Sequence, residues 1–141
     1  MNIDLLNRVS GGHELLEWFG GYAPHFHDAE VLGLTLDRQG ATCSVKVHGF
    51  QMTKEVDAKG LYVCTKHVVV TFLVGELTEL ELSDFGSQNA LMGLSIARGL
   101  DGQFRLELDP ANGLSGIIEG RTLEIAIEPG IPPGSQYLRL G

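Results

Sequence analysis

The stretch FRLELDPANG, residues 104–113, decides the fold. Apolar residues alternate with polar ones in its first half, as in a strand with one buried and one exposed face; the apolar set is Phe104, Leu106 and Leu108. The second half, DPANG, combines a proline that fixes φ with asparagine and glycine, which accept left-handed backbone. A strand followed by a tight turn over residues 109–113 is therefore expected, which favours antiparallel pairing.

The same alternation recurs on both sides of this stretch. Leu123, Ile125 and Ile127 share one face of a strand at residues 122–128. Towards the N-terminus, the turn at residues 38–40 separates two alternating runs, which predicts a hairpin. The first run, from Glu30, places Leu32, Leu34 and Leu36 on one face, and the second places Cys43, Val45 and Val47 on one face.

Three further segments lie between the hairpin and residue 104. Residues 51–60 (QMTKEVDAKG) are polar and are expected to form a connection. Residues 61–74 are apolar on both faces from Val68 onwards, which predicts a central strand covered on two sides by a second layer. Residues 75–85 (GELTELELSDF) change the parity of their leucines, which indicates a bulge or bend.

The N-terminus is the only helical part of the pattern. Asp4 and Ser10 precede helix-like runs, and Gly20 and Gly21 supply a stop. We expect the neighbouring aromatic residues Trp18, Phe19 and Tyr22 to pack this element against the sheet, although such residues also anchor interfaces. The fold class predicted is α+β, mainly antiparallel β, with about seven or eight strands in a curved sheet or sandwich and a short N-terminal helical segment.

Length and composition fit one domain over residues 1–141. We divide it into a helical opening (1–22), an antiparallel β body (28–128) and an irregular tail (129–141) in which Tyr137, Leu138 and Leu140 dock on the body. No run approaches the roughly 18 apolar residues of a membrane span, and no secretory signal is recognisable, so a cytoplasmic location is expected. The two cysteines, Cys43 and Cys64, lie in strand-like runs and are expected to be buried structural thiols.

The net charge of −8 disfavours binding to nucleic acid, because phosphates repel such a surface. A protein partner, in particular a basic one, is the better expectation. The carboxylates of the stretch that lacks cations, residues 68–97, form an acidic strip consisting of Glu76, Glu79, Glu81 and Asp84. The strip is a candidate binding surface for such a partner. It equally fits a solvated sheet face whose charges prevent aggregation.

A second candidate lies at residues 25–30 (HFHDAE). Histidines two apart in an extended chain project to one side, so His25 and His27, with Asp28 and Glu30 nearby, offer ligands suited to Zn or Fe. The alternative interpretation is structural: these side chains satisfy backbone groups at the junction between helix and strand. Other features of known metal motifs are missing, so no cofactor is expected.

The run FGGYAPHFHDAEV, residues 19–31, resembles the opening of bacterial proteins of the immunity protein 50 family. The segments 68–72 and 76–85, and Gln88-Asn89 before Leu94, follow the order seen in that family, over residues 14–127. Ala23 stands where an aromatic residue is commoner. The resemblance implies an antitoxin of a polymorphic toxin system that binds its toxin in the cytoplasm, and it brings no catalytic residues.

Three functions remain open on the sequence alone. The leading hypothesis is a non-catalytic immunity protein that neutralises a cognate toxin by direct binding. The first alternative is a metal-dependent enzyme built on His25, His27 and Glu30. The second alternative is a structural or oligomer-forming domain, which open sheet edges would permit.

Overall fold

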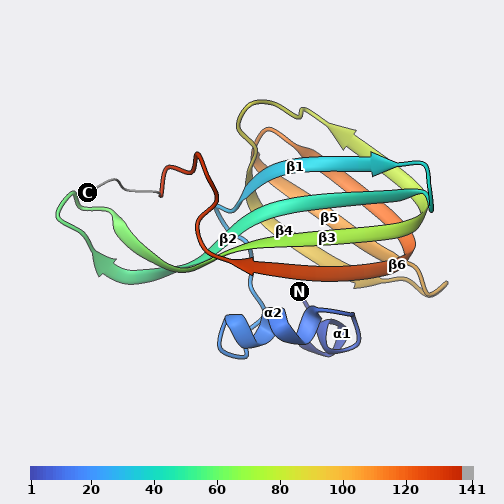
Figure 1. Ribbon diagram of the computed structural model, residues 1–141, viewed down its shortest axis with the longest axis horizontal. Coiled ribbons are helices and arrows are strands. Elements are labelled where there is room, and N and C mark those ends of the chain that lie inside the picture. The colour runs from blue at the N-terminus through green and yellow to red at the C-terminus, as the bar shows by residue number, and fades with distance from the viewer. Residues whose placement is uncertain (138–141) are drawn as a thin grey trace.

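The computed structural model describes residues 1–137 and shows two short helices followed by six strands (Figure 1). The elements are α1 (Ile3–Asn7), α2 (Gly12–Trp18), β1 (Glu30–Asp37), β2 (Thr42–Val56), β3 (Tyr62–Ser83), β4 (Ala90–Arg98), β5 (Phe104–Asn112) and β6 (Ser115–Pro129). All neighbouring strands pair antiparallel in the order β1-β2-β3-β6-β5-β4, and β4 meets β1 to close a barrel. The predicted class, mainly antiparallel β with a helical N-terminus, is confirmed.

The strand count of seven or eight is wrong, because β3 is one strand of 22 residues where two were expected. The chain bends at Glu76, whose φ is 49°, and the register with β6 shifts between Leu77 and Glu79. The bulge predicted from the leucine parity is thus confirmed. A bulge bends a strand without ending it, so pairing with β6 continues to Ser83.

The interior of the barrel is filled by the inward residues of every strand. On β3 these are Val68, Val70, Phe72 and Val74, each fully buried. The outward residues Val69 and Leu73 are only half-buried. The second layer expected over the outer face of β3 is therefore not found among the described residues, because β3 buries only the face that it turns to the interior of the barrel.

The helices fill a gap in the barrel wall. β5 pairs with β6 only as far as Gly120, so the second half of β6 lacks a strand neighbour on that side. Ser10 lies where a strand neighbour would lie, and its carbonyl accepts a hydrogen bond from the Ile125 N–H at 2.7 Å. The two helices lie next to β6 (Figure 1), and their residues Leu6 and Leu15 are fully buried. The helical opening is therefore part of the core, whereas Tyr22, which we expected there, is 76% exposed.

The end of β5 and the register of β1 both differ from expectation. β5 continues through Pro110 to Asn112, so the turn lies at Gly113 (φ 85°) and Leu114. Proline is tolerated there because the pairing of β5 with β6 ends at Leu108, leaving no partner for a missing N–H on that side. In β1, the register shifts between Val31 and Gly33, so the bulge turns Leu32 to the exterior, where it is 39% exposed.

Residues 51–60 are not a simple connection. β2 and β3 stay paired as far as Val56 and Tyr62, forming a two-stranded ribbon that projects beyond the barrel (Figure 1). We call this ribbon, residues 49–67, the arm. The tail after Pro129 is irregular as far as Tyr137; the expected docking of Leu138 and Leu140 lies outside the described residues. No helix within residues 1–137 has the length and apolarity to cross a membrane.

Candidate functional site

The chain between α2 and β1 closes the barrel through its backbone; we call residues 24–31 the closing segment. The Asp28 N–H donates to the Leu91 carbonyl, and the Val31 N–H donates to the Asn89 carbonyl, both at 2.8 Å. Beyond these bonds, the register of β1 with β4 contains a single residue pair. The closing segment is therefore the seam of the barrel.

Two non-glycine residues of the closing segment adopt left-handed backbone, Phe26 with φ 58° and Asp28 with φ 63°. Such conformations cost about 1 kcal/mol or more each and persist only where the surroundings compensate. Phe26 is buried with its ring edge-on to Phe72 at 5.7 Å. Gly49 makes room for it, because a Cβ at residue 49 would lie 3.0 Å from the Phe26 ring.

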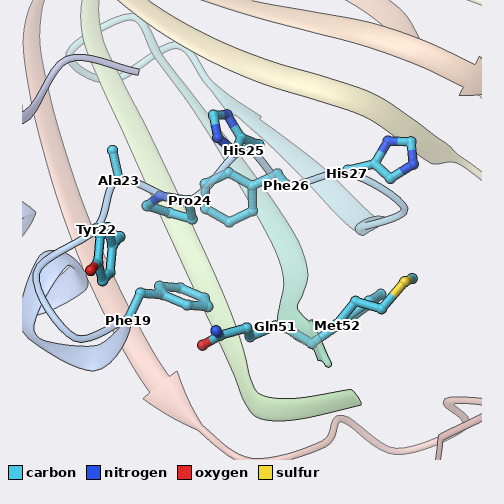
Figure 2. A pocket seen from close by; sticks show the side chains of 10 residues that line it. Phe19, Tyr22, Ala23, Pro24, His25, Phe26, His27, Gln51 and Met52 are labelled. Atoms are coloured by element: carbon cyan, nitrogen blue, oxygen red, sulfur yellow. The ribbon is translucent and has the colours of Figure 1, made fainter. Parts of the chain in front are cut away.

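This backbone also separates the two histidines that we expected on one side. The chain is not extended at Phe26, and Figure 2 shows the His25 and His27 rings apart. The His27 Nδ1–H donates to the Met92 carbonyl at 3.2 Å, and its Nε2 lies 3.5 Å from the Asp28 carboxylate. His27 thus satisfies a backbone group, as the structural interpretation holds. Within residues 1–137, no three side chains of His, Cys, Asp or Glu are placed to hold a metal ion.

An aromatic hollow of about 350 Å³ separates the closing segment from the arm (Figure 2). Its lining residues are Phe19, Tyr22, Ala23, Pro24, His25, Phe26, His27, Phe50, Gln51 and Met52. Met52 also lines a second hollow of about 700 Å³ between the arm and Tyr137. The two hollows therefore share Met52 as a lining residue.

Four rings from three parts of the chain pack together beside the second hollow; they are His48, Phe50, His67 and Tyr137, which we call the ring cluster. The His48 ring lies 5.2 Å from that of His67, and the Tyr137 ring lies 4.9 Å from that of Phe50. His48 points out of the barrel wall, yet it is only 1% exposed because the other rings cover it. The expected docking of Tyr137 on the body is thus confirmed.

The two histidines of the ring cluster form a directed chain of hydrogen bonds. A backbone carbonyl only accepts, so the His67 Nε2–H donates to the Cys64 carbonyl at 3.1 Å. The neutral His67 Nδ1 is then free to accept from the His48 Nε2–H at 3.0 Å. Burial, and secondarily the charge of His67, lowers the pKa of His48 to about 4. The geometry requires one proton, and no more, between the two facing nitrogens.

The cysteines show no sign of an activated thiol. Cys43 is fully buried inside the barrel, as expected, and burial raises the pKa of its thiol. Cys64 is only half-buried, contrary to expectation. Burial raises the pKa of its thiol, and the nearby Asp28 carboxylate raises it further, against a hydrogen bond with Tyr137. A raised pKa disfavours the thiolate, which is the nucleophilic form.

The acidic strip belongs to a wider surface on the far half of β3. Glu79 and Glu81 face outward and are exposed, as expected from parity. The strand register brings carboxylates of the neighbouring strands beside them. Glu79 lies opposite Glu119; Glu81 lies opposite Ile117, which in turn lies opposite Glu107. We call the outward carboxylates of β3, β6 and β5 the acidic face; they are Glu79, Glu81, Glu119, Glu107 and Asp109. Glu76 and Asp84 are exposed at the two ends of this part of β3.

Arg105 lies next to Glu119 of the acidic face. Arg105 donates to the Glu119 carboxylate at 2.8 Å and neutralises it. The other four carboxylates form no ion pair with a cation in the described part of the chain. A groove of about 560 Å³ runs along this face, and its lining includes Glu81, Glu107 and Ile117. Sequence parity identified the residues on β3, but only strand pairing reveals those on β5 and β6.

Comparison with known proteins gives little beyond this geometry. No family model matches the chain, and no curated protein matches it. Among solved structures, the chain is similar to an uncharacterized protein from Neisseria gonorrhoeae. The two share 13% sequence identity with a TM-score of 0.45, over 76% of this chain and 96% of the other. A likeness this distant carries no information on function, so the function has to be argued from the residues of this chain.

Proposed function

We propose that this chain is a cytoplasmic immunity protein that neutralises a cognate bacterial toxin by binding it directly. The observation that carries the proposal is the acidic face, which presents carboxylates from three adjacent strands and in which Arg105 pairs with Glu119. The resemblance of residues 19–31 to immunity proteins supports the same function. The partner proposed is a protein with a basic surface.

The electrostatics of the acidic face favour such a partner. Arg105 already neutralises Glu119, which lies opposite Glu79, whereas Glu81 and Glu107 form no ion pair with a cation of residues 1–137. A basic surface that covers the acidic face gains the attraction of these carboxylates. Clustered charge of one sign also raises the rate of encounter with an oppositely charged partner, by ten- to a thousand-fold in favourable cases. The attraction is screened by salt.

The groove along the acidic face matches the side chains of a basic protein. Its lining combines the apolar residues Ile117 and Leu82 with the carboxylates of Glu81, Glu107 and Asp109. Lysine and arginine bury an apolar stem while keeping the charged group at the rim. The groove therefore offers both halves of the contact that such side chains make.

The test uses the product of the neighbouring open reading frame. Cells that express this product are expected to survive when this chain is co-expressed, and the two purified proteins are expected to bind with an association rate that falls steeply with salt. A neighbouring product that is neither toxic nor bound by this chain would overturn the proposal.

A matched pair of variants tests the surface. Glu79→Lys with Glu81→Lys reverses two charges on the acidic face, whereas Glu55→Lys with Glu124→Lys makes the same change in net charge at exposed positions elsewhere. The first pair is expected to lower the association rate at low salt at least about tenfold. The second pair is expected to lower it only slightly. Equal effects would show that net charge, not this face, governs binding.

A further inference from the structure

We propose that His48 and His67 form an acid-sensitive clasp that holds residues 130–137 against the outer wall of the barrel, and that protonation of the pair releases this segment. The inference is independent of the proposed function, because it involves neither the acidic face nor a partner.

The clasp is built from contacts between the tail and the histidine-bearing strands. At its start, the Gly130 N–H donates to the His67 carbonyl at 2.9 Å. At its far end, the Tyr137 ring lies 5.3 Å from the His67 ring and 5.7 Å from the His48 ring. Pro132 is buried between these two points. The tail therefore rests on the two imidazoles, and the position of Tyr137 depends on theirs.

The pair has room for one proton between its facing nitrogens. The His67 Nε2–H donates to the Cys64 carbonyl, so Nδ1 is the nitrogen that faces His48. Nδ1 can accept from His48 only while it carries no proton. A proton on His67 Nδ1 places two donors 3.0 Å apart unless His48 transfers its own proton to Nδ1. A second proton makes both rings cationic at contact distance. Acid therefore separates the two histidine rings, and the Tyr137 ring loses its contacts with them.

Carboxylates from the neighbouring strands and from the closing segment lie around His48. Glu30 is its register partner on β1 and faces the same side, while Glu128 on β6 lies one strand beyond, across Val69. Asp28 lies near enough to act on both Cys64 and Tyr137. Carboxylates favour an imidazolium, yet the pKa of His48 is lowered to about 4, so burial dominates.

The sign of the pH dependence follows. A released His48 regains the ordinary pKa of about 6.5, whereas the clasped ring has a pKa of about 4. Between these values the released state binds more protons, so acidification favours release within that window. Above about pH 6.5 neither state is protonated at this ring, and the clasp is at its strongest.

The protein carries its own reporter for the test. Trp18 is its single tryptophan, and the indole N–H donates to the carbonyl of Lys66, next to His67, at 2.8 Å. We would record tryptophan emission, far-UV circular dichroism and amide exchange, the last corrected for intrinsic pH dependence, from pH 7.5 to 4. The wild type is expected to lose protection at residues 130–137 together with a change in emission, while the sheet signal persists.

Variants distinguish the clasp from general acid sensitivity. His48→Gln keeps a donor for His67 Nδ1 but has no titrating group, so the midpoint of release is expected to fall by at least ~1 pH unit. His67→Gln, whose amide can accept from His48 and donate to the Cys64 carbonyl, is expected to act likewise if His48→Gln fails to fold. His13→Gln removes an exposed histidine that contacts Glu17 and is expected to match the wild type.

Three results would overturn the clasp. The first is tail exchange that stays constant down to pH 4. The second is the same midpoint in the wild type and in both glutamine variants at residues 48 and 67. The third is loss of tail protection and of the sheet signal in one transition, which would mean that acid unfolds the protein as a whole.

Discussion

Replacing Asn89 by alanine should be among the most destabilising substitutions at a polar residue of this protein. The side chain is 3% exposed and stands between the end of β3 and the turn from β5 to β6. Its Oδ1 accepts from the N–H groups of Gly86 (2.9 Å) and Leu114 (3.0 Å), and its Nδ2 donates to the Gly86 carbonyl (2.9 Å). One amide therefore satisfies three backbone groups, each of which Asn89→Ala would leave without its partner.

The magnitude follows from these three bonds. A hydrogen bond contributes about 1 kcal/mol net, so the loss is about 3 kcal/mol. Leu114 is fully buried, and its unpaired N–H adds roughly 1 kcal/mol more. The sum is a substantial part of the roughly 5–15 kcal/mol by which domains are stable. With a urea m-value of about 2 kcal/mol/M, the unfolding midpoint should fall by about 2 M.

Urea unfolding followed by circular dichroism measures the effect, with Gln88→Ala as the control. Gln88 is the exposed neighbour on the same loop, and its truncation should change stability by less than about 0.5 kcal/mol. A loss below about 1 kcal/mol for Asn89→Ala, or equal losses in the two variants, would refute the role assigned to this amide.

Two further predictions concern the wall of the barrel. Arg105→Ala should lower stability by up to about 1 kcal/mol at low salt, because Glu119 then faces Glu79 without neutralisation, and the loss should shrink in 1 M salt; a salt-independent loss would assign the effect to packing. Gly49→Ala should cost about 1–3 kcal/mol, since the new methyl group presses on the buried Phe26 ring, and thermal unfolding that shows no loss would contradict this packing.

Much of the fold could be predicted because strand patterns are local. The alternation around Val45, Leu106 and Ile125 depends only on neighbouring residues, and each of these residues faces the interior as expected. The strand count failed at Glu76, because the change of leucine parity indicates a bulge but does not show whether the strand continues beyond it. The arm was missed because a ribbon outside the barrel is solvated on both faces, so its sequence is as polar as that of a loop.

The candidate site was less predictable, since it depends on register. Parity placed Glu79 and Glu81 on one exposed face, but nothing local brings Glu107 beside them. Likewise His48 and His67 are 19 residues apart and meet only because β2 pairs with β3. The HFHDAE stretch misled in the opposite direction, because the left-handed backbone at Phe26 turns neighbouring histidines apart.

The closure of the sheet between β1 and β4 has a mechanical consequence. β1 and β4 are joined by a single register pair and a few backbone hydrogen bonds. The barrel should therefore open between these two strands first, long before β3 separates from β6. The opened barrel would still be one continuous sheet, but it would have two unpaired edge strands to which other chains could add. Keeping that joint shut is thus a safeguard against aggregation, which gives the strained closing residues a purpose apart from any partner.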